Sequence, residues 1–352
     1  MRKRKMLAVL LCLMLVVGFS LAACGGGGSS SAAGGSSAAA AEGGSAEAAA
    51  TASGDAPKVV FQVFGTGAPY GAAMAASLEA EAKARGWDYT LMDGKLDATE
   101  NAKCVEEAVA MGVDVIISMP IDSAACSPAY QKAFDAGIPV LNETIKCLPE
   151  DEDLMVGYSG PDDIIHGNEA AELVYDNLPD GGGIIMLTTA PGQDTTVKRQ
   201  QGFEDRLAEL DTDGKFEILQ IINTDSQKEK AISVMNDMIT KYGDKIKAVY
   251  AHEDYSAVGA ALALEESGYA PDDVYIVGVG GSRDGLAGVQ SGQIDATTLQ
   301  SPTRSMVQTA DLVDKIIAEG IKPPAQLDPY DNWLPIPKVT IENVEEYMPG
   351  DW

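Results

Sequence analysis

Acidic and amide side chains stand directly after predicted strands, where they could bind the hydroxyl groups of a small ligand. Glu253 and Asp254 follow one apolar run, and Asn142 and Glu143 come at the end of another. Carboxylates and amides form paired and charge-assisted hydrogen bonds with polar ligands. Ligands of open parallel sheets bind beyond the carboxyl ends of the strands, so these positions are where we expect the functional site.

The triplet His252-Glu253-Asp254 allows more than one interpretation. It could coordinate a metal ion, but adjacent residues at a strand end point in alternating directions. Hydrogen bonding to a ligand, or capping of the helix that starts at Tyr255, is favoured over metal binding.

The sequence gives little support for catalysis or for a cofactor. His166 and His252 are the only histidines, and no G-x-S-x-G nucleophile elbow occurs. We expect His166, which lies among acidic residues on a predicted helix, to be solvated. The turn Gly65-Thr66-Gly67 is similar to the start of a dinucleotide loop, but the third glycine is Gly71, one position late. No phosphate-binding Walker loop is present. We therefore predict no enzymatic activity and no cofactor.

Three cysteines remain beyond the N-terminal region: Cys104, Cys126 and Cys147. Cys126 and Cys147 follow neighbouring predicted strands, so a disulfide between them is geometrically possible. Buried free thiols are at least as strongly favoured. Zinc binding is disfavoured because no C-x-x-C or H-x-x-x-H spacing accompanies these residues.

The elements that position these side chains repeat one plan, a strand, a helix and a parallel strand. In 112–142 the apolar run Asp114–Met119 predicts a strand buried on both faces, and a helix follows from Asp122. That helix ends at Gly137 before the next strand. Residues 247–279 repeat the plan. Two such units predict an α/β protein with two doubly wound lobes.

The rest of the chain alternates in the same way. We expect further strands at 58–64, 87–92, 154–158, 184–189, 216–222 and 294–299, and helices at 70–85, 99–111, 163–177, 195–210, 227–242 and 302–319, before an irregular tail at 323–352.

The N-terminal region has the pattern of a secretory signal. Residues 1–23 combine a basic start with an apolar run, and Leu21-Ala22-Ala23 precedes Cys24. This ending resembles a bacterial lipobox, which implies cleavage before Cys24 and lipidation of that cysteine. An uncleaved membrane anchor is the alternative, because the apolar run is at the lower length limit for a spanning helix. Residues 24–56 consist mostly of Gly, Ser and Ala, so we expect a flexible tether.

The chain is strongly acidic, with 25 basic and 53 acidic residues. This charge disfavours nucleic-acid binding, which needs a basic face. It is compatible with solubility outside the cytoplasm. It also leaves open a preference for cationic ligands.

Several stretches together resemble the ribose-type periplasmic sugar-binding proteins of ABC transporters. They are MGVDVIISMPIDSAACSPAYQKAFDAGIPVLN, KAVYAHEDYSAVGAALALEESG, VYIVGVGGSRDGLAGVQSGQIDATTLQ and KVTIENVEEY. The resemblance covers about 57–348. It implies a type I periplasmic-binding fold, with two Rossmann-like lobes joined by a three-crossing hinge and the ligand in the cleft between the lobes. The implied lobes are 57–160 with 302–330, and 161–301 with 331–352.

The resemblance also implies a ligand site, although the family pattern is only partly kept. The positions expected for an Asp-Arg pair hold Thr144 and Ile145, and the first arginine expected in the second lobe is Val197. With the acidic Glu253 on the other side of the site, these changes indicate that a polyol, a cyclitol or an amino sugar fits as well as ribose or better. The implied ligand-binding residues are Phe64, Thr66, Tyr70, Asn142, Glu143, Thr144, Arg199, Glu253, Asp254 and Gln300.

Together these features predict a lipid-anchored, extracytoplasmic solute-binding protein. We expect it to act as a monomer that delivers a small polar, sugar-like ligand to an ABC permease, with no catalysis, no metal and no nucleic-acid partner. A ligand-presenting sensor for a membrane receptor remains an alternative, as does a secreted α/β enzyme. A repressor effector domain would need a DNA-binding headpiece, which 1–56 does not provide.

Overall fold

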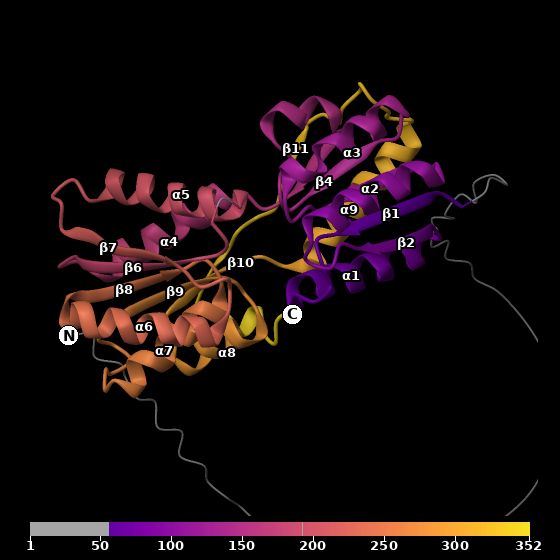
Figure 1. Cartoon of the computed structure of the whole chain (residues 1–352). Coiled ribbons are helices and arrows are strands. Elements are labelled where there is room, and N and C mark those ends of the chain that lie inside the picture. Colours follow the sequence, from indigo (N-terminus) through magenta and orange to yellow (C-terminus); the bar gives the residue numbers. More distant parts are fainter. Residues whose placement is uncertain (1–55, 192) are drawn as a thin grey trace, which may run out of the picture. The chain divides into compact units, whose positions relative to one another are not determined.

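The computed structural model of the chain describes residues 56–191 and 193–352, and these residues form two six-stranded sheets with helices on both faces of each (Figure 1). The predicted signal, the predicted lipidation site at Cys24 and the tether up to residue 55 lie outside the described residues. The predicted α/β class with two parallel-sheet lobes is confirmed.

The sheet of the first lobe has the strand order β11-β5-β4-β3-β1-β2, and its strands are all parallel. Helices α1 and α9 cover one face, and α2 and α3 cover the other. The elements are β1 (Lys58–Val63), α1 (Pro69–Arg85), β2 (Asp88–Asp93), α2 (Ala98–Met111), β3 (Val115–Ser118), α3 (Ser123–Asp135), β4 (Val140–Glu143), the 3-10 helix η1 (Pro149–Leu154), β5 (Gly157–Gly160), α9 (Pro302–Glu319) and β11 (Asp331–Trp333).

The sheet of the second lobe has the order β12-β10-β9-β8-β6-β7, with β12 antiparallel to β10 and the other pairs parallel. Helices α4 and α5 pack on one face, and α6, α7 and α8 pack on the other. The elements are α4 (Asp163–Asn177), β6 (Gly182–Thr188), α5 (Asp194–Leu210), β7 (Phe216–Asn223), α6 (Lys228–Tyr242), η2 (Gly243–Lys245), β8 (Ile246–Ala251), α7 (Asp254–Glu266), β9 (Tyr275–Gly280), α8 (Arg283–Ser291), β10 (Ala296–Leu299), β12 (Lys338–Thr340) and η3 (Val344–Glu346).

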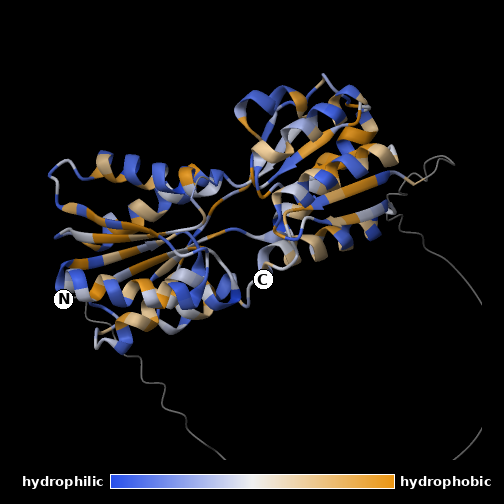
Figure 2. Cartoon of the chain, in the orientation of Figure 1, coloured by the Kyte–Doolittle hydropathy of each residue, from blue (hydrophilic) through white to orange (hydrophobic). Residues whose placement is uncertain are grey.

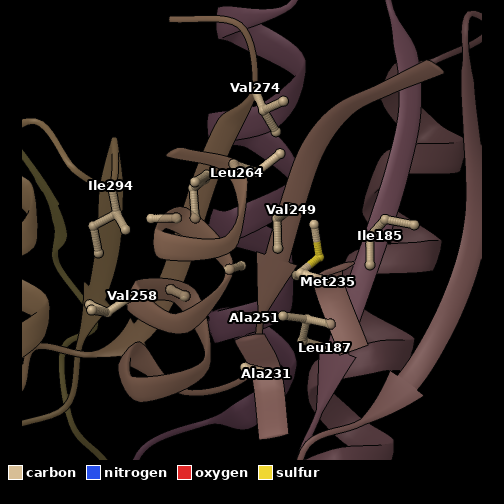
Figure 3. Packing of buried hydrophobic residues seen from close by; sticks show 14 of the residues in the cluster. Ile185, Leu187, Ala231, Met235, Val249, Ala251, Val258, Leu264, Val274 and Ile294 are labelled. Atoms are coloured by element: carbon tan, nitrogen blue, oxygen red, sulfur yellow. The ribbon is translucent and has the colours of Figure 1, made fainter. Parts of the chain in front are cut away.

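The central strands are mostly apolar because helices bury both faces of each sheet. Figure 2 shows this as near-continuous hydrophobic strands, whereas the helices alternate between hydrophobic and hydrophilic residues. In the second lobe, Val249 and Ala251 of β8 pack with Met235 of α6 and Leu264 of α7 (Figure 3). This burial holds the strand ends, and the residues that follow them, in fixed positions.

Local sequence signals set where the helices begin and end. The Asp122 carboxylate accepts a hydrogen bond from the Ala125 amide at 3.0 Å, which caps α3 as predicted. Asp97 caps α2 in the same way. Gly112 takes a left-handed conformation directly after α2, where a side chain would add strain.

The chain passes between the two sheets three times. The passages lie between β5 and α4, between β10 and α9, and between β11 and β12. One detail differs from the lobe boundaries implied by the resemblance, which put 331–352 in the second lobe. Strand β11 instead pairs with β5 of the first sheet. Such short pairings depend on distant partners and leave no local pattern in the sequence.

Three further expectations need correction. The strand predicted at 154–158 starts later, at Gly157, because the 3-10 helix η1 occupies the chain from Pro149. The tail expected to be irregular contains β11, β12 and η3. Helix α8 was not predicted, because its three Gly and Ser positions weaken the helical pattern; Ser282 caps it by accepting a hydrogen bond from Gly285 at 3.1 Å.

Cys104, Cys126 and Cys147 are buried free thiols. The structure therefore agrees with the predicted free thiols and not with a disulfide between Cys126 and Cys147. Within residues 56–191 and 193–352, no helix combines the length and the apolar character needed to cross a membrane.

Candidate functional site

The candidate site is built from residues at the carboxyl ends of strands in both sheets. Tyr70 is the second residue of α1, which follows β1, and Gln300 directly follows β10 on the passage to α9. Glu253 lies between β8 and α7, and Arg199 reaches the site from α5. The parallel arrangement brings these strand ends to one edge of each sheet.

A continuous chain of hydrogen bonds joins these four side chains and links the two lobes. Arg199 Nη2 donates to Gln300 Oε1 at 3.0 Å, and Gln300 Nε2 donates to the Tyr70 hydroxyl at 2.8 Å. Arg199 Nη1 donates to Glu253 Oε1 at 3.1 Å. Four of the ten predicted ligand-binding residues are therefore brought together in one cluster, which we call the inter-lobe cluster (Tyr70, Arg199, Glu253 and Gln300).

Arg199 is the fixed centre of this cluster. Its guanidinium also donates to Asp163 Oδ1 at 2.7 Å and to the His252 carbonyl at 2.6 Å, and only 2% of its side chain is exposed. A guanidinium has five N–H donors, and these contacts use four of them. One N–H of Nη2 therefore has no hydrogen-bond partner among the described residues.

Burial shifts the acid–base properties of the cluster. Removal from water raises the pKa of Glu253 to about 7, against the opposing attraction of Arg199. Burial raises the pKa of Asp163 as well, again against Arg199. The pKa of the Tyr70 phenol lies above its usual value, mainly because of burial; the nearby Glu143 carboxylate adds a smaller repulsive contribution. Tyr70 is thus a neutral hydroxyl at physiological pH, able both to donate and to accept.

Glu143 is the last residue of β4, Thr144 follows it, and the Glu143 carboxyl group is surrounded by hydroxyl groups. Glu143 Oε1 accepts from Ser305 at 2.5 Å and from Thr144 at 2.9 Å, and its other oxygen accepts from Thr309. Glu143 is fully buried, and burial raises its pKa to about 7 although these hydroxyls oppose the shift. The carboxyl group ties β4 to α9, the helix that returns from the second lobe.

The polar atoms of the other predicted site residues are used within the fold. Thr66 donates to Asp93, at the end of β2. Asn142 donates to the carbonyls of Ser118 and Ile145 and accepts from the Cys147 amide.

Asp254 accepts hydrogen bonds from two other elements of the second lobe, from Ser282 and from Thr297 of β10. Phe64 packs at the edge of the first-lobe core, close to Gly71. Ligand contact by these residues, as by Glu143 and Thr144, stays a prediction.

The histidines differ from expectation. His166 is fully buried, not solvated; its Nδ1 is 2.7 Å from the Thr298 hydroxyl because α4 packs this face against β10. His252 is also fully buried, and burial holds the pKa of both imidazoles well below the usual value.

Among the described residues, no group of three or more His, Cys, Asp or Glu side chains is arranged to bind a metal ion. Glu253 occupies the capping position of α7, but its side chain makes no capping hydrogen bond there.

Two features of the site were missed by the sequence analysis. Asp163 supports Arg199, and the acidic pair at 162–163 at the start of a predicted helix was the available signal. Trp352 places its ring beside Tyr70, with the ring centroids 5.2 Å apart. No local pattern in the irregular tail could have indicated this contact.

Comparison with known proteins gives a consistent result. The family model described as periplasmic binding protein domain matches residues 38–321. The ribose import binding protein of Bacillus subtilis (strain 168) is 28% identical over 252 residues, which cover 72% of this chain and 76% of that protein. The xylitol-binding protein of Mycolicibacterium smegmatis (strain ATCC 700084 / mc(2)155) is 28% identical over 272 residues, or 76% of this chain and 73% of the relative.

Among solved structures, the Caulobacter myo-inositol binding protein bound to myo-inositol matches with a TM-score of 0.73 and 23% identity. The match covers 83% of this chain and 98% of that chain. At this identity the likeness concerns the fold: two α/β lobes of the kind described above.

Proposed function

Because the chain belongs to the periplasmic binding protein family, whose domain matches residues 38–321, we propose that it captures a small sugar or polyol outside the cytoplasm for an ABC importer. Members of this family are solute-binding transport components and not enzymes.

The inter-lobe cluster is the observation that carries the proposal. Tyr70 comes from the first lobe, Arg199 and Glu253 come from the second, and Gln300 lies on a passage between them. A ligand that replaces or extends these bonds contacts both lobes at once. Its binding energy would then favour the arrangement in which the lobes are drawn together about the three passages.

The groups that remain available in the cluster suit a polyhydroxyl ligand. Glu253 Oε2 makes no hydrogen bond within the described residues, and the Glu253 side chain is 22% exposed. The fifth N–H of Arg199 adds a hydrogen-bond donor, and the Tyr70 hydroxyl can both donate and accept a hydrogen bond. Neighbouring sugar hydroxyls, each both donor and acceptor, match such a mixed set, and the Tyr70 ring offers a surface to the C–H face of the ligand.

The relatives narrow the class of ligand to test. The names of two of them specify ribose and xylitol, and a structural neighbour contains myo-inositol. Glu253 has a pKa of about 7, so it can bind a neutral hydroxyl in its protonated form or an amine in its ionised form. We therefore include polyols, cyclitols and amino sugars beside pentoses among the candidate ligands.

The proposal for localisation rests on the sequence. The order Leu21-Ala22-Ala23-Cys24 after a basic and apolar segment supports lipidation of Cys24. The Gly/Ser/Ala-rich segment at 24–56 would let the binding domain reach a permease in the same membrane. The domain would act there as a monomer.

Mass spectrometry of small molecules released from the purified protein by denaturation tests the proposal. A co-purified sugar, polyol or cyclitol that raises the melting temperature when added back supports it. At 100 times the dissociation constant, ligand binding stabilises the folded protein by ~2.7 kcal/mol. If no pentose, hexose, polyol, cyclitol or amino sugar shifts the melting temperature of the ligand-free protein, the proposed ligand class is wrong.

A further inference from the structure

The indole ring of Trp352 lies between an aromatic side chain of each lobe. Its centroid is 5.2 Å from that of Tyr70 and 5.9 Å from that of Tyr255, with both pairs in edge-to-face geometry. Tyr70 belongs to α1 in the first lobe and Tyr255 to α7 in the second. Trp352 therefore joins the aromatic side chain of the inter-lobe cluster to the helix that follows Glu253.

The backbone around Trp352 is held in this position. The Arg283 amide donates to the main-chain oxygen of Trp352 at 2.7 Å. The neighbouring Asp351 carboxylate accepts from the Ser301 hydroxyl and from the Thr303 amide, at the passage between β10 and α9. The tail is thus fastened both to the second lobe and to the passage that carries Gln300.

Glycine at the end of β9 makes room for the indole. A Cβ atom at Gly280 would lie 2.9 Å from Cζ2 of Trp352, closer than real Cβ contacts, and Gly280 has φ +135°. A side chain here would meet both a steric and a conformational penalty. The approach of the ring to the strand end depends on this glycine.

The indole nitrogen is the group that this packing does not satisfy. Trp352 Nε1 is buried and has no hydrogen-bond partner among the described residues. An indole N–H can only donate, and leaving a buried donor unpaired is costly. A cavity of about 220 Å³ adjoins the ring, and Gln300, Arg304 and Asp351 also line it. A hydroxyl-bearing molecule at this place could accept the indole hydrogen bond.

We propose that Trp352 is a ligand-contacting residue of this site. In the cavity that it lines with Gln300 of the inter-lobe cluster, its ring covers the C–H face of a sugar or polyol, and its Nε1–H donates to a ligand hydroxyl. This role rests on the proposed function, and it adds a residue from the tail to the site formed by the two lobes. An aromatic surface and a directed donor on one side chain would make Trp352 a determinant of ligand shape as well as of affinity.

Two variants of Trp352 separate the contributions of the ring and of the N–H. Binding is measured by calorimetry against a panel of D-ribose, xylitol, myo-inositol and D-glucosamine, and against any co-purified sugar. Trp352→Phe keeps a ring but removes the donor, and should weaken binding about 2- to 12-fold. Trp352→Ala removes both and should weaken binding at least about tenfold. The matched control is Trp333→Phe, because Trp333 is 42% exposed on β11 and packs on Tyr158.

Fluorescence gives a second readout that does not depend on a loss of binding. The chain has three tryptophans, so Trp87→Phe with Trp333→Phe leaves Trp352 as the only one. Addition of the ligand should change its emission and protect it from iodide quenching. Unchanged affinity in both Trp352 variants overturns the proposal, as does tighter binding by Trp352→Ala, which would make the indole a competitor of the ligand. If the wild-type protein binds no member of the panel and no co-purified sugar, the proposed function fails first, and this role of Trp352 fails with it.

Discussion

Replacement of Arg199 by methionine tests how the inter-lobe cluster is held together. Methionine keeps much of the side-chain volume but removes the charge and four hydrogen bonds. Asp163, with 3% of its side chain exposed, is then left buried without its cationic partner. Breaking a buried pair by removing one partner typically costs about 3–5 kcal/mol, so we expect the free energy of unfolding to fall by about that amount at pH 8.

The loss should depend on pH in a defined direction. Arg199 opposes the raised pKa of Asp163 and Glu253, so its removal raises both values further. The folded variant then binds protons that the unfolded chain releases, and its stability falls as pH rises. The deficit relative to the wild type should therefore be larger at pH 8 than at pH 5.

Urea unfolding followed by circular dichroism at the two pH values measures this effect. The matched control is Arg206→Met on the same helix, where a partly exposed arginine pairs with Glu172 and Glu209; it should leave the unfolding midpoint nearly unchanged. Adding Asp163→Asn to Arg199→Met should recover part of the loss, because no unpaired carboxylate then remains at 163. A deficit in Arg199→Met no larger than in Arg206→Met, or one that grows at low pH, would refute the reasoning.

Three further predictions concern single side chains. Glu143→Gln should make the curve of unfolding free energy against pH shallower between about pH 4.5 and 7. The raised pKa of Glu143 destabilises the folded wild-type protein by up to about 3 kcal/mol as pH rises through that window, and glutamine does not titrate. An unchanged slope in urea titrations would contradict this. Glu253→Gln should weaken calorimetric binding more for an amino sugar than for its neutral analogue, since loss of one partner of a desolvated charged pair typically costs about 2–5 kcal/mol; equal losses would make Glu253 an ordinary hydroxyl acceptor. Cys24→Ala should release the protein from the membrane or leave an uncleaved precursor in cell fractions, because stable anchoring needs lipid; a mature-length species that stays with the membrane would exclude lipidation at Cys24.

The sequence predicted the alternation of strands and helices well, because apolar runs bounded by local caps determine these elements. The run Asp114–Met119 contains β3, and Asp122 caps α3 as expected. Elements whose partners lie far away in the chain were harder to predict. Strand β11 forms by pairing with β5, and nothing within its own three residues distinguishes it from a loop.

In the candidate site, too, the features set by local sequence were predicted and those that depend on distant residues were not. The position of Glu253 after a strand was predicted from the run that precedes it, but its pairing with Arg199 depends on how α5 packs against β8. The burial of His166 escaped prediction for a similar reason, since its acidic neighbours in sequence suggested solvent and the packing of α4 on the sheet buries it. Trp352 reaches the site because the tail packs on the segments around Arg283 and Ser301, and no local sequence pattern indicates this packing.

Calorimetric titration of the Gln300→Ala variant tests the central claim most directly, because Gln300 is hydrogen-bonded both to Arg199 and to Tyr70. We expect one binding site for a sugar or polyol in the wild-type protein, and a loss of affinity of tenfold or more, about 1.4 kcal/mol, in the variant. Gln290→Ala, on the exposed side of α8 where the glutamine contacts Glu345, should bind as the wild type does. Full affinity in Gln300→Ala would contradict a ligand site built on the inter-lobe cluster.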